Sequence, residues 1–269
     1  MFKKGHRQLK KAIQNSNSKT TDWGNVAHWY NKHLEDKDSY HAMVVAPNLD
    51  RLVALKQGET MLELGCGQGF FLEKFSARTK PENLFGIDLG GELIALAKQK
   101  NQNINYIVAS ADDTTILPNR TFDVVTIILA LQNMRNLDAV VTNVSRLLSP
   151  KGRAHIVLNH PAFRIPKQSD WIFDEKSKTQ TRVMKKYLSE EEIAIDMNPG
   201  SLSNKEMTVS FHRPLQVYSK AFHKHGLAIS KIEEWISHKK SEEGVRSVAE
   251  DVARKEFPLF MCLELRKFL

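Results

Sequence analysis

Short apolar runs alternate with helix-like patterns through the first half of the chain. Five runs have the length and composition of buried strands, and they span residues 61–64, 84–87, 106–108, 124–129 and 155–158. Between them, apolar residues recur at helical spacing, as in 92–100 and in 137–148, where Pro150 and Gly152 mark the stop. This alternation predicts parallel β-α-β units whose helices cover both faces of one sheet.

The alternation stops after residue 158 and returns at Pro214. Residues 160–213 mix aromatic and charged positions, and so long a departure inside a compact domain is typical of a lid or a substrate-binding insertion. From Pro214 onward, the spacing predicts a helix that ends at Gly226. Two further strands, 227–235 and 259–265, are expected to be antiparallel neighbours at a sheet edge. The helical pattern between them carries Val245, Val248 and Val252.

Together these patterns predict an α/β fold. We expect a Rossmann-like doubly wound sheet of about seven strands, mostly parallel with an antiparallel edge, and a cap inserted after the fifth strand. The predicted division is a basic tail (1–21), an N-terminal helical cap segment (22–56), a ligand-binding core (57–159), the inserted cap (160–213) and the C-terminal part of the core (214–269). Within the N-terminal segment, Pro47 opens a helix with Leu49, Leu52 and Val53 on one face.

The excess of positive charge lies mainly in the tail. The formal net charge is +8, and six Lys and Arg residues precede the first acidic residue, Asp22. A basic terminus is either solvated or an arm for RNA, and the sequence leaves both interpretations open.

Composition excludes several other classes of protein. No apolar stretch approaches the roughly 20 residues that span a bilayer, so we expect no membrane partner. With Cys66 and Cys262 as its two cysteines, the chain has no disulfide scaffold and no cysteine-rich metal site, and we expect it to be cytoplasmic. The sequence leaves the oligomeric state open.

The segment from Glu63 to Gly69, ELGCGQG, carries the strongest chemical signal. Glycines at alternate positions after a buried strand let the backbone approach a ligand at the carboxyl end of that strand. A dinucleotide fingerprint needs its third glycine where this chain has Phe70. An acid two residues before the first glycine favours instead a cofactor without a pyrophosphate and with a cationic amine.

Acidic residues also follow the next two strands. Asp88 ends the second strand, where a carboxylate accepts hydrogen bonds from vicinal ribose hydroxyls. Asp112 follows the third strand, where it is placed to meet an adenine edge. Each acid alone has a structural interpretation, as a helix cap or a turn initiator. Three such strand ends at consecutive junctions favour a nucleoside ligand.

At these motifs the sequence resembles the class I S-adenosylmethionine-dependent methyltransferases, in the branch described as type 11 methyltransferases. Residues 63–69 resemble the first motif of that family, 86–88 the second and 110–113 the third; 122–131 resemble its fourth strand, and 144–152 the approach to its fifth. The resemblance implies S-adenosylmethionine as cofactor, with Glu63 holding the methionine amine, Asp88 the ribose and Asp112 near adenine. The full implied cofactor set is Tyr40, Glu63, Gly65, Cys66, Gly67, Gly69, Asp88, Leu89, Ala111, Asp112 and Leu129.

The implied reaction is methyl transfer to an oxygen or nitrogen atom of a small-molecule acceptor. His160 and His212 are the candidate general bases, because an unperturbed histidine pKa of about 6.5 suits that role. The alternative for each is a structural or surface histidine. Arg164, Tyr187 and Arg213 are candidates for holding an acidic substrate. Gln132-Asn133 stand where many relatives carry paired histidines, which weakens any assignment of the acceptor by analogy.

Two other functions compete with this one. An RNA methyltransferase would use the basic tail, although residues 161–213 carry nine basic against eight acidic residues and so form no cationic groove. A nicotinamide-dependent oxidoreductase is disfavoured by Phe70.

Overall fold

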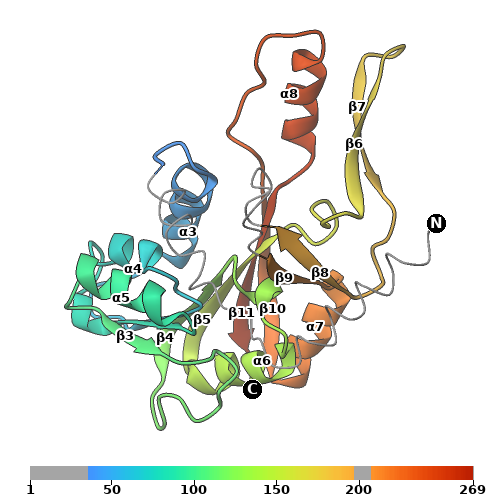
Figure 1. Cartoon of the computed structure of the whole chain (residues 1–269). Helices are drawn as coiled ribbons and strands as arrows, with labels where there is room; N and C mark the ends of the chain where they lie inside the picture. Colours follow the sequence, from blue (N-terminus) through green and yellow to red (C-terminus); the bar gives the residue numbers. More distant parts are fainter. Residues whose placement is uncertain (1–35, 197–206, 269) are drawn as a thin grey trace.

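The computed structural model of the chain describes residues 36–196 and 207–268 (Figure 1). The predicted basic tail, 1–21, and the first part of the N-terminal cap segment, 22–35, lie outside the described residues, as do residues 197–206 of the insertion.

Seven strands form one sheet in the order β10-β11-β5-β4-β1-β2-β3. Their bounds are Met61–Leu64 (β1), Leu84–Asp88 (β2), Asn105–Val108 (β3), Phe122–Ile128 (β4), Leu148–Asn159 (β5), Leu227–Trp235 (β10) and Phe260–Lys267 (β11). Strands β1 to β5 are parallel to one another, and β11 runs antiparallel to both β5 and β10. The predicted fold class is confirmed, with β11 inserted between β5 and the edge strand β10.

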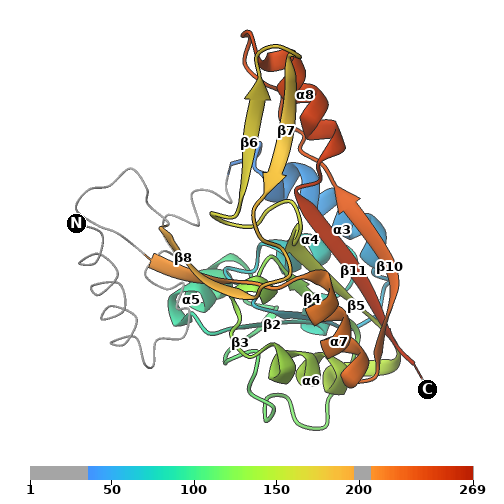
Figure 2. The ribbon, with the colours of Figure 1, turned by 90° about the vertical axis from the view of Figure 1, so that its right-hand side faces the viewer.

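Helices cover both faces of this sheet (Figures 1 and 2). One buried apolar cluster joins the sheet to α6 (Leu137–Leu147) and α7 (Leu215–Lys224). A second cluster joins it to α3 (Ala46–Val53), α4 (Phe70–Phe75) and α5 (Gly91–Lys100). Helix α3 has Pro47 in its first turn and buries Leu49 and Val53, as the spacing predicts. Three short helices precede or connect these elements: η2 (His41–Val45), η3 (Pro81–Asn83) and η4 (Leu131–Asn133).

The parallel register brings the carboxyl ends of five strands to one edge of the sheet. Strand β1 lies between β2 and β4, so the chain leaves it in one direction for β2 and β3 and in the other for β4 and β5. Ligands of doubly wound sheets bind outside the strand ends at such a switch point. The Gly-rich loop, which follows β1 there, is therefore in the expected place for a ligand.

The insertion after β5 contains two antiparallel hairpins, which the sequence analysis did not predict. Strands β6 (Ser169–Asp174) and β7 (Thr179–Met184) form the first, and β8 (Glu191–Asp196) and β9 (Met207–His212) form the second. Trp171 and Phe173 alternate with more exposed positions along β6, a period-two signal that the surrounding charges masked.

Hairpin β6–β7 and helix α8 (Ser247–Glu256) lie side by side and project beyond the sheet (Figures 1 and 2). The Trp171 ring is 5.3 Å from that of Phe257, and the Arg246 guanidinium is 4.9 Å from the Phe173 ring. The helix predicted between the last two strands is present as α8, but its residues Val248 and Val252 are 77% and 58% exposed. This helix projects from the body, and Ala253 is its one fully covered residue.

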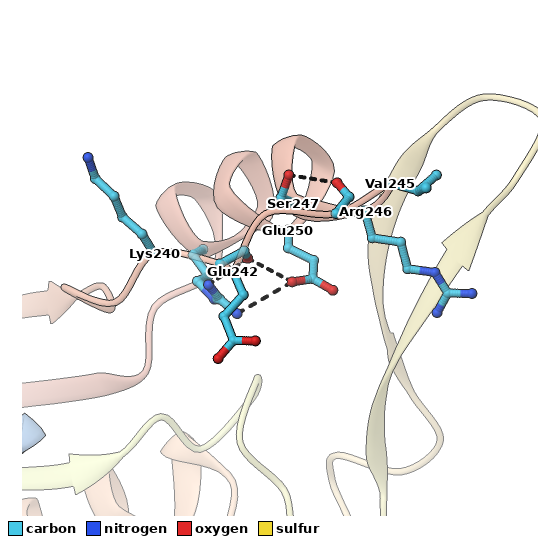
Figure 3. A pocket seen from close by; sticks show the side chains of 9 residues that line it. Lys240, Glu242, Val245, Arg246, Ser247 and Glu250 are labelled. Atoms are coloured by element: carbon cyan, nitrogen blue, oxygen red, sulfur yellow. Dashed lines mark hydrogen bonds and ion pairs between the residues drawn. The ribbon is translucent and has the colours of Figure 1, made fainter.

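A groove of about 590 Å³ lies between helix α8 and the loop before it (Figure 3). Its lining is mainly polar, and Glu250 accepts a hydrogen bond from Ser241 Oγ (2.7 Å) and pairs with Arg254 (3.6 Å). Because this groove is on the projecting arm, away from the strand ends, it is not the ligand site that the strand ends define.

Candidate active site

The Gly-rich loop has a backbone that glycine alone adopts easily. Gly65, Gly67 and Gly69 have φ of 75°, 54° and 75°, in the left-handed region. A Cβ on Gly69 would lie 2.2 Å from the Tyr106 hydroxyl, and one on Gly65 would lie 2.7 Å from Ala130 Cβ. The loop is also tied to β2, since the N–H groups of Gly65 and Cys66 both donate to the Ile87 carbonyl (2.7 and 3.0 Å). The loop is thus closely packed between β3 and the turn after β4.

Asp88 is oriented by two backbone donors. The Gly67 N–H donates to one carboxylate oxygen and the Gly90 N–H to the other, each at 2.8 Å. These contacts fix the carboxylate between the Gly-rich loop and the start of α5. A carboxylate oxygen accepts more than one hydrogen bond, so this geometry fits two vicinal hydroxyl donors as well.

Glu63 is a buried carboxylate with an unsatisfied oxygen. The residue is 1% exposed, and its Oε2 has no hydrogen-bond partner among the described residues. Burial, together with the charge of Asp88, raises the pKa of Glu63 well above its usual range. A buried acceptor without a donor is costly, and a cationic amine beside the Gly-rich loop would satisfy it.

The loop after β3 is held by a residue that the sequence analysis missed. Asn143 on α6 is fully buried and donates to the carbonyls of Ala111 (2.8 Å) and Asp113 (3.0 Å). The Ser110 hydroxyl donates to Asp112 Oδ1. The sequence does carry a signal for this role, because Asn143 is a polar residue inside the apolar face of the predicted 137–148 helix. Asn143 is a positioning residue for the loop that the resemblance assigns to adenine.

Two further segments flank the loop. Leu129, directly after β4, has φ of 53° and donates its N–H to the Val157 carbonyl (2.8 Å), while Leu89 beside Asp88 is 38% exposed. On the N-terminal side, the His41 ring lies 6.3 Å from that of Phe70, which begins α4. Tyr40 packs edge-on against Phe260, and its hydroxyl is 3.3 Å from Ser237 Oγ. The N-terminal segment therefore reaches the end of the Gly-rich loop.

His160 uses both ring nitrogens within the protein. Its Nδ1 accepts the N–H groups of Ala162 and Phe163 (3.2 Å each), so Nε2 carries the proton and donates to Glu234 (2.6 Å). Burial lowers the pKa of this histidine, against the opposing effect of Glu234. In this geometry His160 shapes the turn after β5 and offers no lone pair to a substrate.

The other candidates form a second group on the opposite side of β5. His212 donates from Nε2 to the Tyr187 carbonyl (2.7 Å), and the Tyr187 hydroxyl accepts the Leu215 N–H at the start of α7 (3.1 Å). Arg213 is 6% exposed and donates to the carbonyls of Met134 and Arg135 (2.9 and 2.8 Å). These contacts hold hairpin β8–β9 on the turn after β4. Arg164, by contrast, is exposed on the turn that His160 shapes.

Within the described ranges, no helix is long and apolar enough to cross a membrane, and no group of three or more His, Cys, Asp or Glu side chains is arranged to hold a metal ion.

Solved structures share this fold, and a family model matches the sequence of its core. A family model described as a methyltransferase domain matches residues 62–156, from β1 through most of β5. A solved S-adenosylmethionine-dependent methyltransferase from Mesorhizobium loti has a TM-score of 0.64 at 24% identity, over 82% of this chain and 96% of that one. Residues 62–156 therefore form a methyltransferase domain, and the chain has the fold of the class I S-adenosylmethionine-dependent methyltransferases. The resemblance drawn from the sequence motifs is confirmed, and S-adenosylmethionine is the cofactor of this class.

Two curated relatives match parts of the chain. A ubiquinone biosynthesis O-methyltransferase of Dechloromonas aromatica (strain RCB) is 27% identical over 50% of this chain. A ubiquinone/menaquinone biosynthesis C-methyltransferase of Pasteurella multocida (strain Pm70) is 29% identical over 37% of it. The alignments span 59% and 39% of those two proteins.

The raised pKa of Glu63 predicts proton release when the cofactor binds. An amine that pairs with this carboxylate lowers its pKa, so binding expels a proton between the free and bound pKa values, and affinity increases with pH over that range. Calorimetry with S-adenosylhomocysteine in buffers of different ionisation enthalpy measures the number of protons released. The Glu63→Gln variant should lose this release. Equal proton release by the variant and the wild-type chain would contradict the assignment of Glu63.

Proposed function

We propose that the chain transfers the methyl group of S-adenosylmethionine to an oxygen or nitrogen atom of a small molecule. The observation that carries this proposal is the pair of acids on the two sides of the Gly-rich loop. Glu63 is buried and lacks a partner for Oε2, whereas Asp88 is oriented by Gly67 and Gly90 toward the same edge. Glu63 suits a cation and Asp88 suits a ribose, and S-adenosylmethionine carries both a cationic amine and a ribose.

In this proposal each segment around the loop has one part of the cofactor to hold. Glu63 binds the methionine amine, Gly65 and Gly67 pass beneath the methionine, and Asp88 binds the ribose hydroxyls. Asn143 positions Ala111 and Asp112 beside the adenine. The bound cofactor supplies an electrophilic methyl group, so the remaining task of the protein is to align the acceptor with it.

The inserted hairpins favour a small acceptor. Arg135 forms a bidentate pair with Glu192 on β8 (2.8 Å for each bond), and Arg213 caps the turn after β4. Hairpin β8–β9 is thereby held over the edge of the sheet where the cofactor would lie. His212 at the end of this hairpin stays our candidate base if the acceptor must lose a proton.

The names of the two curated relatives include both an O-methyltransferase and a C-methyltransferase of quinone biosynthesis. The matched methyltransferase domain, 62–156, ends before the inserted hairpins begin, so the identity of the acceptor does not follow from it.

The test is transfer of labelled methyl from S-adenosylmethionine to a panel of small molecules and to total tRNA and rRNA. We expect the full chain to label a small molecule at oxygen or nitrogen, and a chain lacking residues 1–21 to do so at a similar rate with a similar melting temperature. Label in RNA, lost with residues 1–21 and decreasing steeply with salt, would support the RNA methyltransferase instead. Label at a carbon atom of a small molecule would correct the proposed acceptor atom and leave the proposed methyl transfer in place.

A further inference from the structure

The turn after β5 presents an arginine that forms no ion pair among the described residues. Arg164 is exposed, and its backbone N–H donates to the His160 carbonyl (2.8 Å), closing the turn that the His160 ring shapes. Several other arginines of the chain meet carboxylates, as Arg153 does at Glu59 and Arg135 at Glu192. Arg164 is therefore oriented by its backbone, while its guanidinium remains available for a ligand.

Among the described residues, a second arginine without an ion pair is held beside this turn by neutral partners. Arg182 extends from β7, donating from Nε to the Phe163 carbonyl (2.8 Å) and from Nη2 to Ser169 Oγ (2.6 Å). Its guanidinium also lies 4.9 Å from the Trp171 ring. Phe163 directly precedes Arg164 in the chain, so these contacts bring the Arg182 guanidinium to the turn that carries Arg164.

Neighbouring protein groups act on both guanidiniums. Arg164 is exposed, and desolvation by the protein around it lowers its pKa. Desolvation, and then the charge of Arg164, lower the pKa of Arg182, with Asp170 opposing them from β6. Two neighbouring cations with no paired carboxylate in the described part of the chain gain most from an anion that contacts both.

The pair also lies at the edge of the sheet where the methyl group would be presented. Arg164 follows the carboxyl end of β5 by a few residues, and Tyr40 of the N-terminal segment lies near it. The neighbouring His41 contacts Phe70 at the end of the Gly-rich loop. The ring of Phe163, whose centroid is 4.7 Å from that of the His160 ring, supplies an apolar wall.

We propose that Arg164 and Arg182 bind an anionic group, a carboxylate or a phosphate, on the methyl acceptor. This inference rests on the proposed function, because it assigns the pair to the acceptor of that same reaction. The planar guanidinium forms two parallel hydrogen bonds to such a group, which fixes its orientation as well as its charge. The acceptor would then be a small acid, held by its anion while its nucleophilic atom faces the cofactor.

The experiment is a calorimetric titration of the full chain, saturated with S-adenosylhomocysteine, with benzoate, phenyl phosphate and the neutral benzamide at constant ionic strength. The variants are Arg164→Gln, Arg164→Lys and Arg182→Gln. The control is Arg120→Gln, because Arg120 is another exposed arginine without an ion pair in the described chain, located before β4 at the opposite edge of the sheet.

We expect at least one anion to bind more than tenfold tighter than benzamide, and Arg164→Gln to remove this preference while Arg164→Lys keeps part of it and Arg120→Gln keeps all of it. The anion that binds more tightly identifies the group. Equal binding of anions and benzamide, or equal losses in Arg164→Gln and Arg120→Gln, would overturn the inference. If Arg182→Gln loosens the hairpin, the Arg164 variants decide alone. Failure of S-adenosylhomocysteine to bind would reject the proposed function instead.

Discussion

Replacing Asp88 with alanine is expected to weaken S-adenosylhomocysteine binding by a hundredfold or more. Two charge-assisted hydrogen bonds to the ribose are lost, each worth about 1.5–3 kcal/mol. The substitution also removes the acceptor for the Gly67 and Gly90 N–H groups, so the Gly-rich loop loses its link to α5. Calorimetric titration of the purified variant measures the change in affinity.

A neighbouring acid provides the control for this experiment. Asp113 lies in the loop after β3, but its carboxylate accepts the Thr115 N–H (2.9 Å) within an exposed turn. Asp113→Ala should therefore bind S-adenosylhomocysteine as the wild-type chain does. A folded Asp88→Ala variant with wild-type affinity would show that Asp88 does not bind the ribose.

Replacing His155 with valine is expected to stabilise the protein by about 1–3 kcal/mol, the cost of an unsatisfied buried polar group. His155 lies in the middle of the sheet, opposite Thr126 of β4 and Glu264 of β11. It is fully buried, and neither ring nitrogen has a hydrogen-bond partner among the described residues. Valine removes both orphaned nitrogens and suits a central strand. Urea unfolding at neutral pH measures the difference in the free energy of unfolding.

The same substitution should change how stability depends on pH. Burial lowers the pKa of His155 to about 4 in the folded chain, below its ordinary value of 6.5. The unfolded chain therefore binds the extra proton first as pH decreases, and the wild-type protein loses about 3 kcal/mol between those two values. His155→Val should lack this loss. A variant that is less stable than wild type at neutral pH, with an unchanged acid response, would contradict this account of His155.

The parallel core was predictable because its inner strands β1, β2 and β4 are buried on both faces and read as continuous apolar runs. Strand β5 shows the limit of that signal: it begins at Leu148 and runs through Pro150 and Gly152, two residue types that usually end an element. The hairpins of the insertion were missed because their strands are only half buried, so charged residues interrupt the alternation. For α8, the spacing of the valines predicts a helix correctly, although Val248 and Val252 do not form a buried face.

Some residues of the candidate site were likewise predictable from the sequence, and others were not. Glu63, Asp88 and the glycines were predictable because each lies at or next to the carboxyl end of a strand, and strand order alone brings them to one edge. Asn143 and Arg182 come from distant elements, so their contacts with the loop at Ala111 and with the turn at Phe163 depend on tertiary packing. His160 and Tyr187 have suitable chemistry in the sequence, but the fold uses both to hold backbone groups in place.

The central claim is that the edge formed by Glu63, the Gly-rich loop and Asp88 binds S-adenosylmethionine. Its most direct test is a calorimetric titration of the full chain with S-adenosylhomocysteine, run beside an identical titration with NAD. We predict one-to-one binding of S-adenosylhomocysteine and no heat of binding from NAD. Binding of NAD without binding of S-adenosylhomocysteine would contradict the claim and would support a nicotinamide-dependent enzyme instead.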